Sequence, residues 1–386
     1  MTDLCDPEQG ISGQAMPIDP DLRGILEERR SVRSAAPYQP LSLSAIRQSV
    51  DLFLRDHLPG QEAVDVFRLG GGASKEQFAV IARDGSGQVQ KYVVRADPLE
   101  TVTVTDRRRE NEVLRLVQGL IPAPEVIYLD CTRRFFDQPT IVMRFVEGVT
   151  KPANSPRGVT GIGVAFGSPL RDRLKTQFLD HLVALHGIDL AAASLQNFSV
   201  PRPNTKEATS WQLGYWSEIW RQDMIEEVPI ISYVREWLTR NRPITARPVM
   251  LHTDYRTGNF LFDEPSGIIT AILDWEMAHI GDFHEEVAQF LQPTTAVMDG
   301  GVWRANDMFE RQEFLDAYAA ASGRSIDAAT LHYYELFWAY KVYICTVGTA
   351  SAVARAQHSH QDLVLATLPG MSPLLLTRMC NLLEAA

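Results

Sequence analysis

The N-terminal third of the chain alternates short apolar runs with turn-forming residues, a pattern typical of antiparallel strands. The runs at 64–69, 76–82 and 90–96 are rich in valine and phenylalanine and are separated by glycine-containing turns. Two further runs of the same kind lie at 122–130 and 139–148. The pattern therefore predicts a sheet built from these segments.

Two segments of this region show helical spacing instead. Apolar side chains recur every three or four residues over 42–58, where Ser42 or Ser44 can cap the helix. The apolar stripe consists of Ile46, Val50, Phe53, Leu54 and Leu58. The segment 107–120 has the same spacing and ends near Gly119, so it predicts a second helix.

The composition changes after Gly148. The segment 149–169 is rich in proline and glycine and predicts a loop or lid. Helical spacing then dominates at 170–189, 209–222 and 231–241. A β-branched run at 267–278 ends in acidic residues, which predicts a late strand.

This order of elements predicts an α+β protein with two lobes and a cleft between them. The small, strand-rich N-lobe covers 38–148 and the larger helical C-lobe covers 149–386. Residues 1–37 are rich in proline, glycine and charge, so we expect a mobile segment with a short helix at 21–30.

Composition and charge narrow the class of protein. The 386 residues are 45% hydrophobic, which is ample for a large core, and the net charge of −11 disfavours nucleic acid and anionic membranes as partners. The four cysteines form no CxxC pair, which argues against a disulfide framework or a zinc cluster. We see no basic-then-apolar leader and no apolar run near the roughly 18 residues of a membrane span. We therefore expect a soluble cytoplasmic protein.

The stretch LHTDYRTGNFLF at 251–262 concentrates the candidate chemistry. His252, Asp254 and Asn259 share one turn between apolar segments, and Asp274 ends the apolar run ITAILD. Phosphoryl transfer needs a carboxylate beside the attacking hydroxyl and oxygen ligands that hold magnesium against phosphates. Each feature alone is an ordinary loop feature, but the D-x-x-x-x-N spacing followed by a strand-ending Asp favours a kinase-like site.

HTDYRTGNFLF…AILDWEMAHIGD resembles the signature HGDxxxxN…DWE…GDP of the aminoglycoside phosphotransferase-like family. That family has a protein-kinase-like fold and includes choline, homoserine and fructosamine kinases. Within it, the pattern is most similar to the kinase domains linked to acyl-CoA dehydrogenases. The resemblance extends from about Val66 to the C-terminal helices and is strongest over 249–290.

The resemblance implies roles for five residues of the C-lobe. Asp254 matches the catalytic carboxylate, and His252 matches the residue that braces the catalytic loop. Asn259 and Asp274 match the magnesium ligands, and Glu276 matches an acid that supports the metal in some members.

The N-lobe supplies candidates for binding the nucleotide phosphates. A glycine-rich turn lies between two predicted strands, although Lys75 breaks the GxGxxG pattern. The residues whose backbone amides we expect near the phosphates are Gly71, Gly72, Ala73 and Ser74. Arg95 stands where protein kinases carry the phosphate-binding Lys, and its expected partner is Glu110, with Glu112 as the alternative. These two acids point about 200° apart on a helix, so only one can face the cleft.

Three positions depart from the family pattern. Thr253 replaces the usual Gly of HGD, and because a β-branched residue resists positive φ we expect a changed turn geometry. Phe283 replaces the usual Pro of GDP, and Glu286 stands where an Asp is common. All three lie away from the atoms that would transfer phosphate.

The favoured function is a magnesium-dependent small-molecule kinase that uses ATP, with GTP as an alternative. The acceptor would be a small alcohol, hydrophobic or hydroxyacyl in character, because no dense acidic run is present to bind a polycationic aminoglycoside. Aromatic clusters at 211–220 and 333–343 predict either an acceptor pocket or core packing, and His358 and His360 are expected at the surface. The oligomeric state is left open.

Two alternatives come from other classes of function. A catalytically silent nucleotide-binding module that regulates a partner is favoured by Arg95 in place of Lys. A metal-dependent phosphohydrolase would use Asp254, Asp274 and His252 and would not need the glycine-rich turn.

Overall fold

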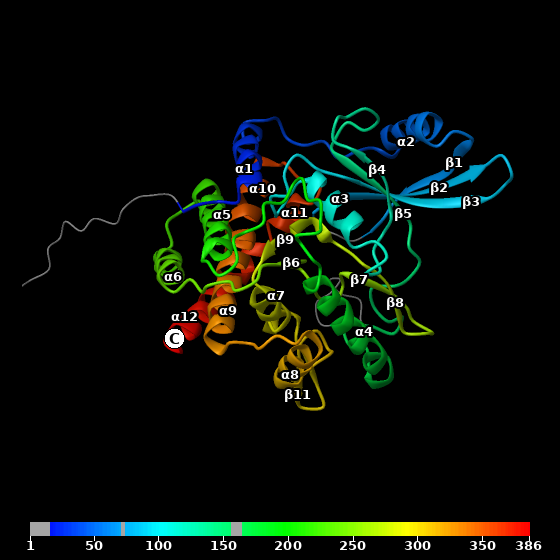
Figure 1. Ribbon diagram of the computed structural model, residues 1–386. Coiled ribbons are helices and arrows are strands. Elements are labelled where there is room, and N and C mark those ends of the chain that lie inside the picture. The colour runs from blue at the N-terminus through cyan, green and yellow to red at the C-terminus, as the bar shows by residue number, and fades with distance from the viewer. Residues whose placement is uncertain (1–15, 71–73, 156–163) are drawn as a thin grey trace, which may run out of the picture.

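The computed structural model describes residues 16–70, 74–155 and 164–386. The predicted strands form one antiparallel five-stranded sheet with the order β1-β2-β3-β5-β4 (Figure 1). The strands are β1 (Gln61–Arg68), β2 (Glu76–Asp84), β3 (Val89–Ala96), β4 (Val126–Asp130) and β5 (Thr140–Arg144). This sheet and the helical region that follows it confirm the predicted α+β fold.

Two helices flank the sheet. Helix α2 (Leu43–His57) begins where the Ser42 hydroxyl accepts a hydrogen bond from Ala45 N, and it buries its apolar stripe against the sheet. Helix α3 (Arg107–Leu116) begins at Asp106, whose carboxylate accepts a hydrogen bond from Arg108 N. Val113 and Leu114 are buried, so α3 presents its remaining faces to the β3–α3 loop and to the C-lobe.

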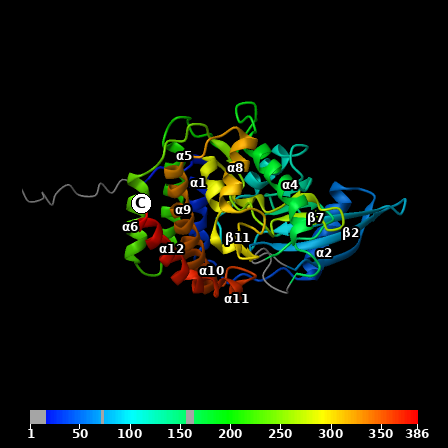
Figure 2. The same ribbon diagram turned by 90° about the horizontal axis from the view of Figure 1, so that it is seen from below.

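The C-lobe is mainly helical, as predicted. Its central helix α9 contacts α6, α7 and α12 and continues through a π-helical segment, Ile344–Thr349, into α10 (Figure 2). The helices are α4 (Ser168–His186), α5 (Glu207–Asp223), α6 (Pro229–Arg240), α7 (Phe283–Phe290), α8 (Arg311–Ser322), α9 (Ala328–Tyr343), α10 (Ala350–Ala356), α11 (Asp362–Leu365) and α12 (Ser372–Glu384).

Short antiparallel pairs interrupt the helices, and two of them flank the candidate motifs. Strand β6 (Val249–Leu251) pairs with β9 (His279–Gly281), and β7 (Phe260–Asp263) pairs with β8 (Ile268–Ile272). The third pair joins β10 (Val297–Asp299) to β11 (Val302–Arg304). The catalytic-loop motif therefore lies between β6 and β7, and the DWE motif lies between β8 and β9.

The aromatic clusters belong mainly to the core. Trp216 and Trp220 on α5 are buried, and most aromatic residues of α9 are buried with them; Trp211 and Trp338 are half-buried. Tyr215 and Trp216 also line a cavity of about 30 Å³ beside Thr253, which is too small in this state for a drug-sized ligand. Of the two interpretations, core packing accounts for these residues.

Helix α1 (Pro20–Val32) is packed rather than loose. Leu22 and Leu26 are buried in the main core, and the helix agrees with the short helix expected at 21–30. Arg29 donates to Asp223 at the end of α5 (2.6 Å). The remainder of the segment expected to be mobile, residues 1–15, lies outside the described residues.

His358 is buried, contrary to its expected surface position, while His360 is half-buried. The His358 Nδ1 lies 2.6 Å from Glu100 Oε2, and Glu100 also faces Arg33 (2.8 Å). This ionic cluster joins α1, the β3–α3 loop and the segment after α10. Sequence spacing could not reveal it, because its members lie far apart along the chain.

Two helical stretches, Ala328–Ala356 and Asp362–Glu384, are long and apolar enough to cross a membrane by length and composition alone. This corrects the expectation that no such run exists. The first stretch is mostly buried inside the C-lobe. The second is interrupted by the 3-10 turn Leu368–Met371, so its continuous helix α12 has 13 residues. At 1.5 Å per residue, α12 spans about 20 Å, less than the roughly 30 Å of a hydrocarbon core.

The segment before α1 approaches the backbone of α5 closely at Gly214. A Cβ atom there would lie 3.0 Å from Pro17 C and 3.1 Å from Met16 O. We expect Gly214→Ala to lower the free energy of unfolding by about 1–3 kcal/mol, because backbone atoms must move to admit the methyl group. Urea unfolding measures the change. The control is Gly24→Ala on α1, where a Cβ meets nothing within 4 Å and the helix propensity gain is the same. Equal effects of the two substitutions would contradict the close contact.

Candidate active site

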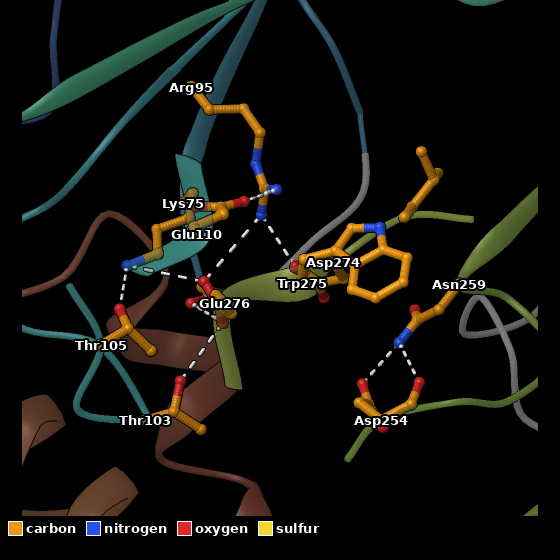
Figure 3. A network of polar contacts seen from close by, with 12 residues as sticks. Lys75, Arg95, Thr103, Thr105, Glu110, Asp254, Asn259, Asp274, Trp275 and Glu276 are labelled. Atoms are coloured by element: carbon orange, nitrogen blue, oxygen red, sulfur yellow. Dashed lines mark hydrogen bonds and ion pairs between the residues drawn. The ribbon is translucent and has the colours of Figure 1, made fainter. Parts of the chain in front are cut away.

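The Asp254 carboxylate is held on both sides within the catalytic loop. Asn259 Nδ2 donates to Asp254 Oδ2 (2.5 Å) and to its main-chain oxygen (3.0 Å) (Figure 3). Arg256 Nε donates to Asp254 Oδ1 (2.8 Å). The Asp254 side chain is 27% exposed. Asp254 raises the pKa of Arg256, so a cation stays beside the carboxylate. The loop thus presents an oriented, solvent-accessible carboxylate.

His252 holds this loop by two hydrogen-bond contacts with backbone atoms. Its Nε2 lies 2.8 Å from the Leu273 carbonyl oxygen, and Asp254 N donates to its Nδ1 (3.2 Å). These contacts assign the neutral tautomer with the proton on Nε2. The ring is fully buried and packs on Trp275, with ring centroids 4.6 Å apart. The imidazole contacts the backbone of the catalytic loop, not the Asp254 carboxylate.

Thr253 adopts φ of +63°, so the turn keeps a left-handed residue despite the missing glycine. The expectation of a changed turn geometry is therefore wrong. Glu286 explains how the strain is tolerated: its Oε1 accepts from Thr253 N (2.6 Å) and its Oε2 accepts from His252 N (2.9 Å). The Thr253 hydroxyl donates to the Met277 carbonyl (2.9 Å), and His186 Nε2 lies 3.1 Å from Glu286 Oε2. Sequence reasoning missed His186, which no local motif marks.

Arg95 joins the N-lobe to Asp274. Its Nη1 donates to Glu110 Oε1 (2.7 Å) on α3, and its Nη2 donates to Asp274 Oδ1 (2.8 Å) after β8 (Figure 3). Burial opposes the charge of the guanidinium, but the two carboxylates raise the pKa of Arg95 above its usual value. Burial likewise raises the pKa of Asp274, yet Arg95 outweighs it and lowers that pKa.

The structure places Glu110, and not Glu112, beside Arg95. Glu112 instead accepts hydrogen bonds from the main-chain and side-chain nitrogens of Asn197, each at 2.8 Å. The separation of about 200° between the two acids on the helix explains this division.

Glu276 lies among N-lobe side chains. Its Oε1 accepts from Ser74 Oγ (2.7 Å) and Thr103 Oγ1 (3.2 Å), and its Oε2 lies 3.5 Å from Lys75 Nζ (Figure 3). Burial raises its pKa above the ordinary value. Lys75 also bonds Asp97 (2.9 Å), so the residue that broke the glycine pattern belongs to a buried ionic network. Sequence reasoning missed Lys75, Thr103 and Asp97, whose partners lie in other segments.

The oxygen atoms of Asp274 and Asn259 fit a magnesium ion. Within the part of the chain described, no group of three or more His, Cys, Asp or Glu side chains gathers as a metal site. Magnesium, however, needs only one or two carboxylates besides phosphate and water oxygens. Among the described residues, Asp274 Oδ2 and Asn259 Oδ1 accept no hydrogen bond, and Leu273 N donates to Asn259 O (2.7 Å), which keeps the two segments adjacent. Gly71, Gly72 and Ala73 lie outside the described residues.

Glu285, Lys341 and His279 form a buried ionic triad next to the candidate site. Glu285 on α7 lies 3.1 Å from Lys341 Nζ and 3.2 Å from His279 Nε2. Burial would raise the pKa of Glu285, but His279 and Lys341 outweigh it and lower the pKa from 4.5 to about 2. A depressed pKa stabilises the fold above the unfolded-state pKa and ceases to do so as the pH falls through the folded-state pKa.

We therefore expect the free energy of unfolding of the wild type to fall by about 3 kcal/mol more than that of Glu285→Gln as the pH decreases from above 4.5 towards 2. At pH 7 the same variant should be destabilised by about 3–5 kcal/mol, because Lys341 keeps a buried charge without its partner. Urea unfolding at several pH values measures both effects. Glu236→Gln, at an exposed ion pair on α6, should keep the wild-type slope. Parallel pH profiles for wild type and Glu285→Gln would contradict the pKa assignment.

The chain is similar to several known proteins over half of its length or more. The chain is 24% identical over 208 residues to mouse acyl-CoA dehydrogenase family member 10, covering 52% of this chain but only 18% of that protein. A candidate aminoglycoside phosphotransferase from Ralstonia eutropha matches with a TM-score of 0.61 at 18% identity, over 86% of this chain and 98% of that one. The GDP complex of aminoglycoside 2'-phosphotransferase-IIIa matches with a TM-score of 0.53 at 16% identity, over 87% and 99%.

The two solved structures share the fold of this chain. The phosphotransferase enzyme family matches residues 65–336, which include the sheet, the catalytic loop and most of the C-lobe core. The chain therefore belongs to the phosphotransferase enzyme family.

Proposed function

We propose that this phosphotransferase is a magnesium-dependent small-molecule kinase that transfers the γ-phosphoryl group of ATP, or of GTP, to a hydroxyl group. The observation that carries the proposal is the placement of Asp254 beside Asn259, with Asp274 linked through Arg95 to Glu110. A silent module would not need an oriented, accessible carboxylate next to two free oxygen ligands. The nucleotide is supported by the GDP complex of the related fold.

The residues divide the work of the reaction between them. Asp254 orients the acceptor hydroxyl and receives its proton as the bond to phosphorus forms. Arg256 keeps a positive charge next to Asp254 and holds its Oδ1 by a hydrogen bond of 2.8 Å. Asp274 and Asn259 would hold magnesium, which neutralises charge on the phosphates when it is bound. Arg95 would supply positive charge to the phosphates, and its buried Nε has no hydrogen-bond partner among the described residues.

The acceptor we propose is a hydroxyacyl thioester or another hydrophobic alcohol. The supporting observation is the match to part of an acyl-CoA dehydrogenase family member, a protein named for thioester chemistry. The chain also has no dense acidic run to receive a polycation.

Thermal unfolding with ATP and GTP, each with and without magnesium, tests the nucleotide site first. A ligand that binds only the folded state raises the midpoint, so we expect a shift that depends on magnesium. A screen of alcohols and hydroxyacyl thioesters with labelled nucleotide then tests transfer. Binding without transfer to any acceptor would favour the regulatory module, and phosphate release independent of acceptor, well above slow leakage, would favour the phosphohydrolase.

A further inference from the structure

We propose that Glu276 is not a magnesium ligand but a positioning residue that holds the end of the glycine-rich loop against the C-lobe. The inference rests on the proposed nucleotide-dependent function, which it deepens. It replaces the role in metal binding that the family resemblance implies for this residue. We call the set of contacts made by the Glu276 carboxylate with Ser74, Lys75 and Thr103 the interlobe contact.

The interlobe contact joins segments that lie on opposite sides of the cleft. Glu276 belongs to the 3-10 turn Trp275–Met277 after β8, in the C-lobe. Ser74 and Lys75 directly precede β2, and Thr103 lies in the β3–α3 loop, all in the N-lobe. Oε1 accepts two hydrogen bonds from hydroxyl groups, and Oε2 faces the Lys75 ammonium. Oε2 has no hydrogen-bond partner among the described residues, so its contact with the N-lobe is the ion pair with Lys75 at 3.5 Å.

The local charge makes this position unfavourable for a metal. Lys75 Nζ lies 3.5 Å from Glu276 Oε2, and Arg95 Nη2 lies 3.9 Å from the same oxygen. A divalent cation bound to this oxygen would be repelled by both groups, whereas Asp274 pairs with Arg95 through Oδ1 and keeps Oδ2 free. The side chain of Glu276 is 6% exposed, whereas that of Asp274 is 32% exposed with one free oxygen. The two acids of the DWE motif therefore have different tasks.

The contact with Ser74 fixes the point at which the glycine-rich loop enters β2. Residue 74 directly follows Gly71, Gly72 and Ala73, which are proposed to cover the phosphates and lie outside the described residues. Loss of the interlobe contact should weaken nucleotide binding while leaving the magnesium requirement unchanged. Loss of Asp274 should change the magnesium requirement itself.

The test measures ATP affinity of the full chain over a range of magnesium concentrations. The four variants compared with wild type are Glu276→Ala, Glu276→Gln, Ser74→Ala and Asp274→Asn. At saturating magnesium we expect Ser74→Ala and Glu276→Ala to bind ATP about three- to tenfold more weakly than wild type. Glu276→Gln should recover part of the loss, because its amide oxygen can still accept from Ser74 and Thr103. The magnesium concentration that gives half-maximal binding should stay within about twofold of wild type for all Glu276 and Ser74 variants. If Glu276→Gln raises the magnesium concentration for half-maximal ATP binding as much as Asp274→Asn does, the inference is overturned.

A double-mutant cycle on urea unfolding tests the interlobe contact without any nucleotide. The combined Ser74→Ala and Glu276→Ala variant should be less destabilised than the sum of the single variants, because one shared hydrogen bond is lost in each. Ser86→Ala, at the exposed β2–β3 turn, serves as the serine control and should be additive with Glu276→Ala. Additivity of Ser74 and Glu276 would refute the contact even if the chain proves to be a kinase. Failure of the wild type to bind nucleotide would refute the proposed function. The double-mutant cycle would then still show whether Ser74 and Glu276 interact.

Discussion

Asp254→Asn should lower the turnover number by about 10²- to 10⁴-fold and leave the nucleotide-induced thermal shift nearly unchanged. The substitution keeps the size of the side chain but removes the charge that would receive the proton of the acceptor hydroxyl. It also leaves a neutral group beside Arg256, whose Nε now donates to the carboxylate at 2.8 Å. The measurement is initial-rate transfer of labelled phosphate to the acceptor identified in the screen.

Asp316→Asn on the exposed face of α8 is the matched control for this substitution, and it should turn over like wild type. Comparable turnover by Asp254→Asn and wild type would remove Asp254 from the chemistry. A variant that loses both turnover and its nucleotide shift would point instead to collapse of the loop, because Asn259 also bonds the Asp254 main-chain oxygen.

Local patterns predicted many of the elements. The apolar runs at 76–82 and 90–96, bounded by turn residues, identified β2 and β3, and the stripe on α2 identified the face that packs on the sheet. The sequence placed Asp254 and Asn259 in one turn, and the structure joins the two side chains by a hydrogen bond of 2.5 Å. In each case the information lies within about one turn or one strand pair, where backbone geometry fixes which side chains meet.

Long-range contacts could not be read in the same way. Lys75 looked like a break in a glycine motif, yet its partners Asp97 and Glu276 lie in segments far away in sequence. The short helix at 21–30 was predicted, but its ion pair between Arg29 and Asp223, 194 residues away, was not. A charged side chain in a short stretch of sequence is usually exposed. It can be buried when a residue of opposite charge, far away in sequence, pairs with it in the fold.

Thr253 illustrates a third limit of local propensity. A β-branched residue disfavours a left-handed conformation by itself, so the sequence predicts a different turn. Two hydrogen bonds to the buried Glu286 carboxylate impose the conformation nonetheless. Tertiary contacts therefore override a local preference at the loop that carries the candidate catalytic residue.

Asp274→Asn should raise the magnesium concentration that supports half-maximal ATP binding by tenfold or more. Even residues that only orient metal ligands cost about 10- to 100-fold in metal affinity, and Asp274 would be a ligand with one oxygen free for the ion. Asparagine keeps the shape and an oxygen but loses the negative charge that magnesium prefers. ATP binding is measured by calorimetry at a series of magnesium concentrations.

The substitution also removes a partner of Arg95, so a change in nucleotide affinity alone would be ambiguous. Glu110→Gln separates the two effects, because it removes the other carboxylate partner of Arg95 and leaves Asp274 and Asn259 in place. We expect Glu110→Gln to weaken ATP binding with an unchanged magnesium midpoint, since it disturbs Arg95 and Arg107, the two cationic partners of Glu110, but neither proposed magnesium ligand. If both variants move the magnesium midpoint equally, Asp274 acts through Arg95 and not as a ligand. If only Asp274→Asn moves it, the left-handed residue after β8 is the point at which the C-lobe presents its carboxylate to the metal.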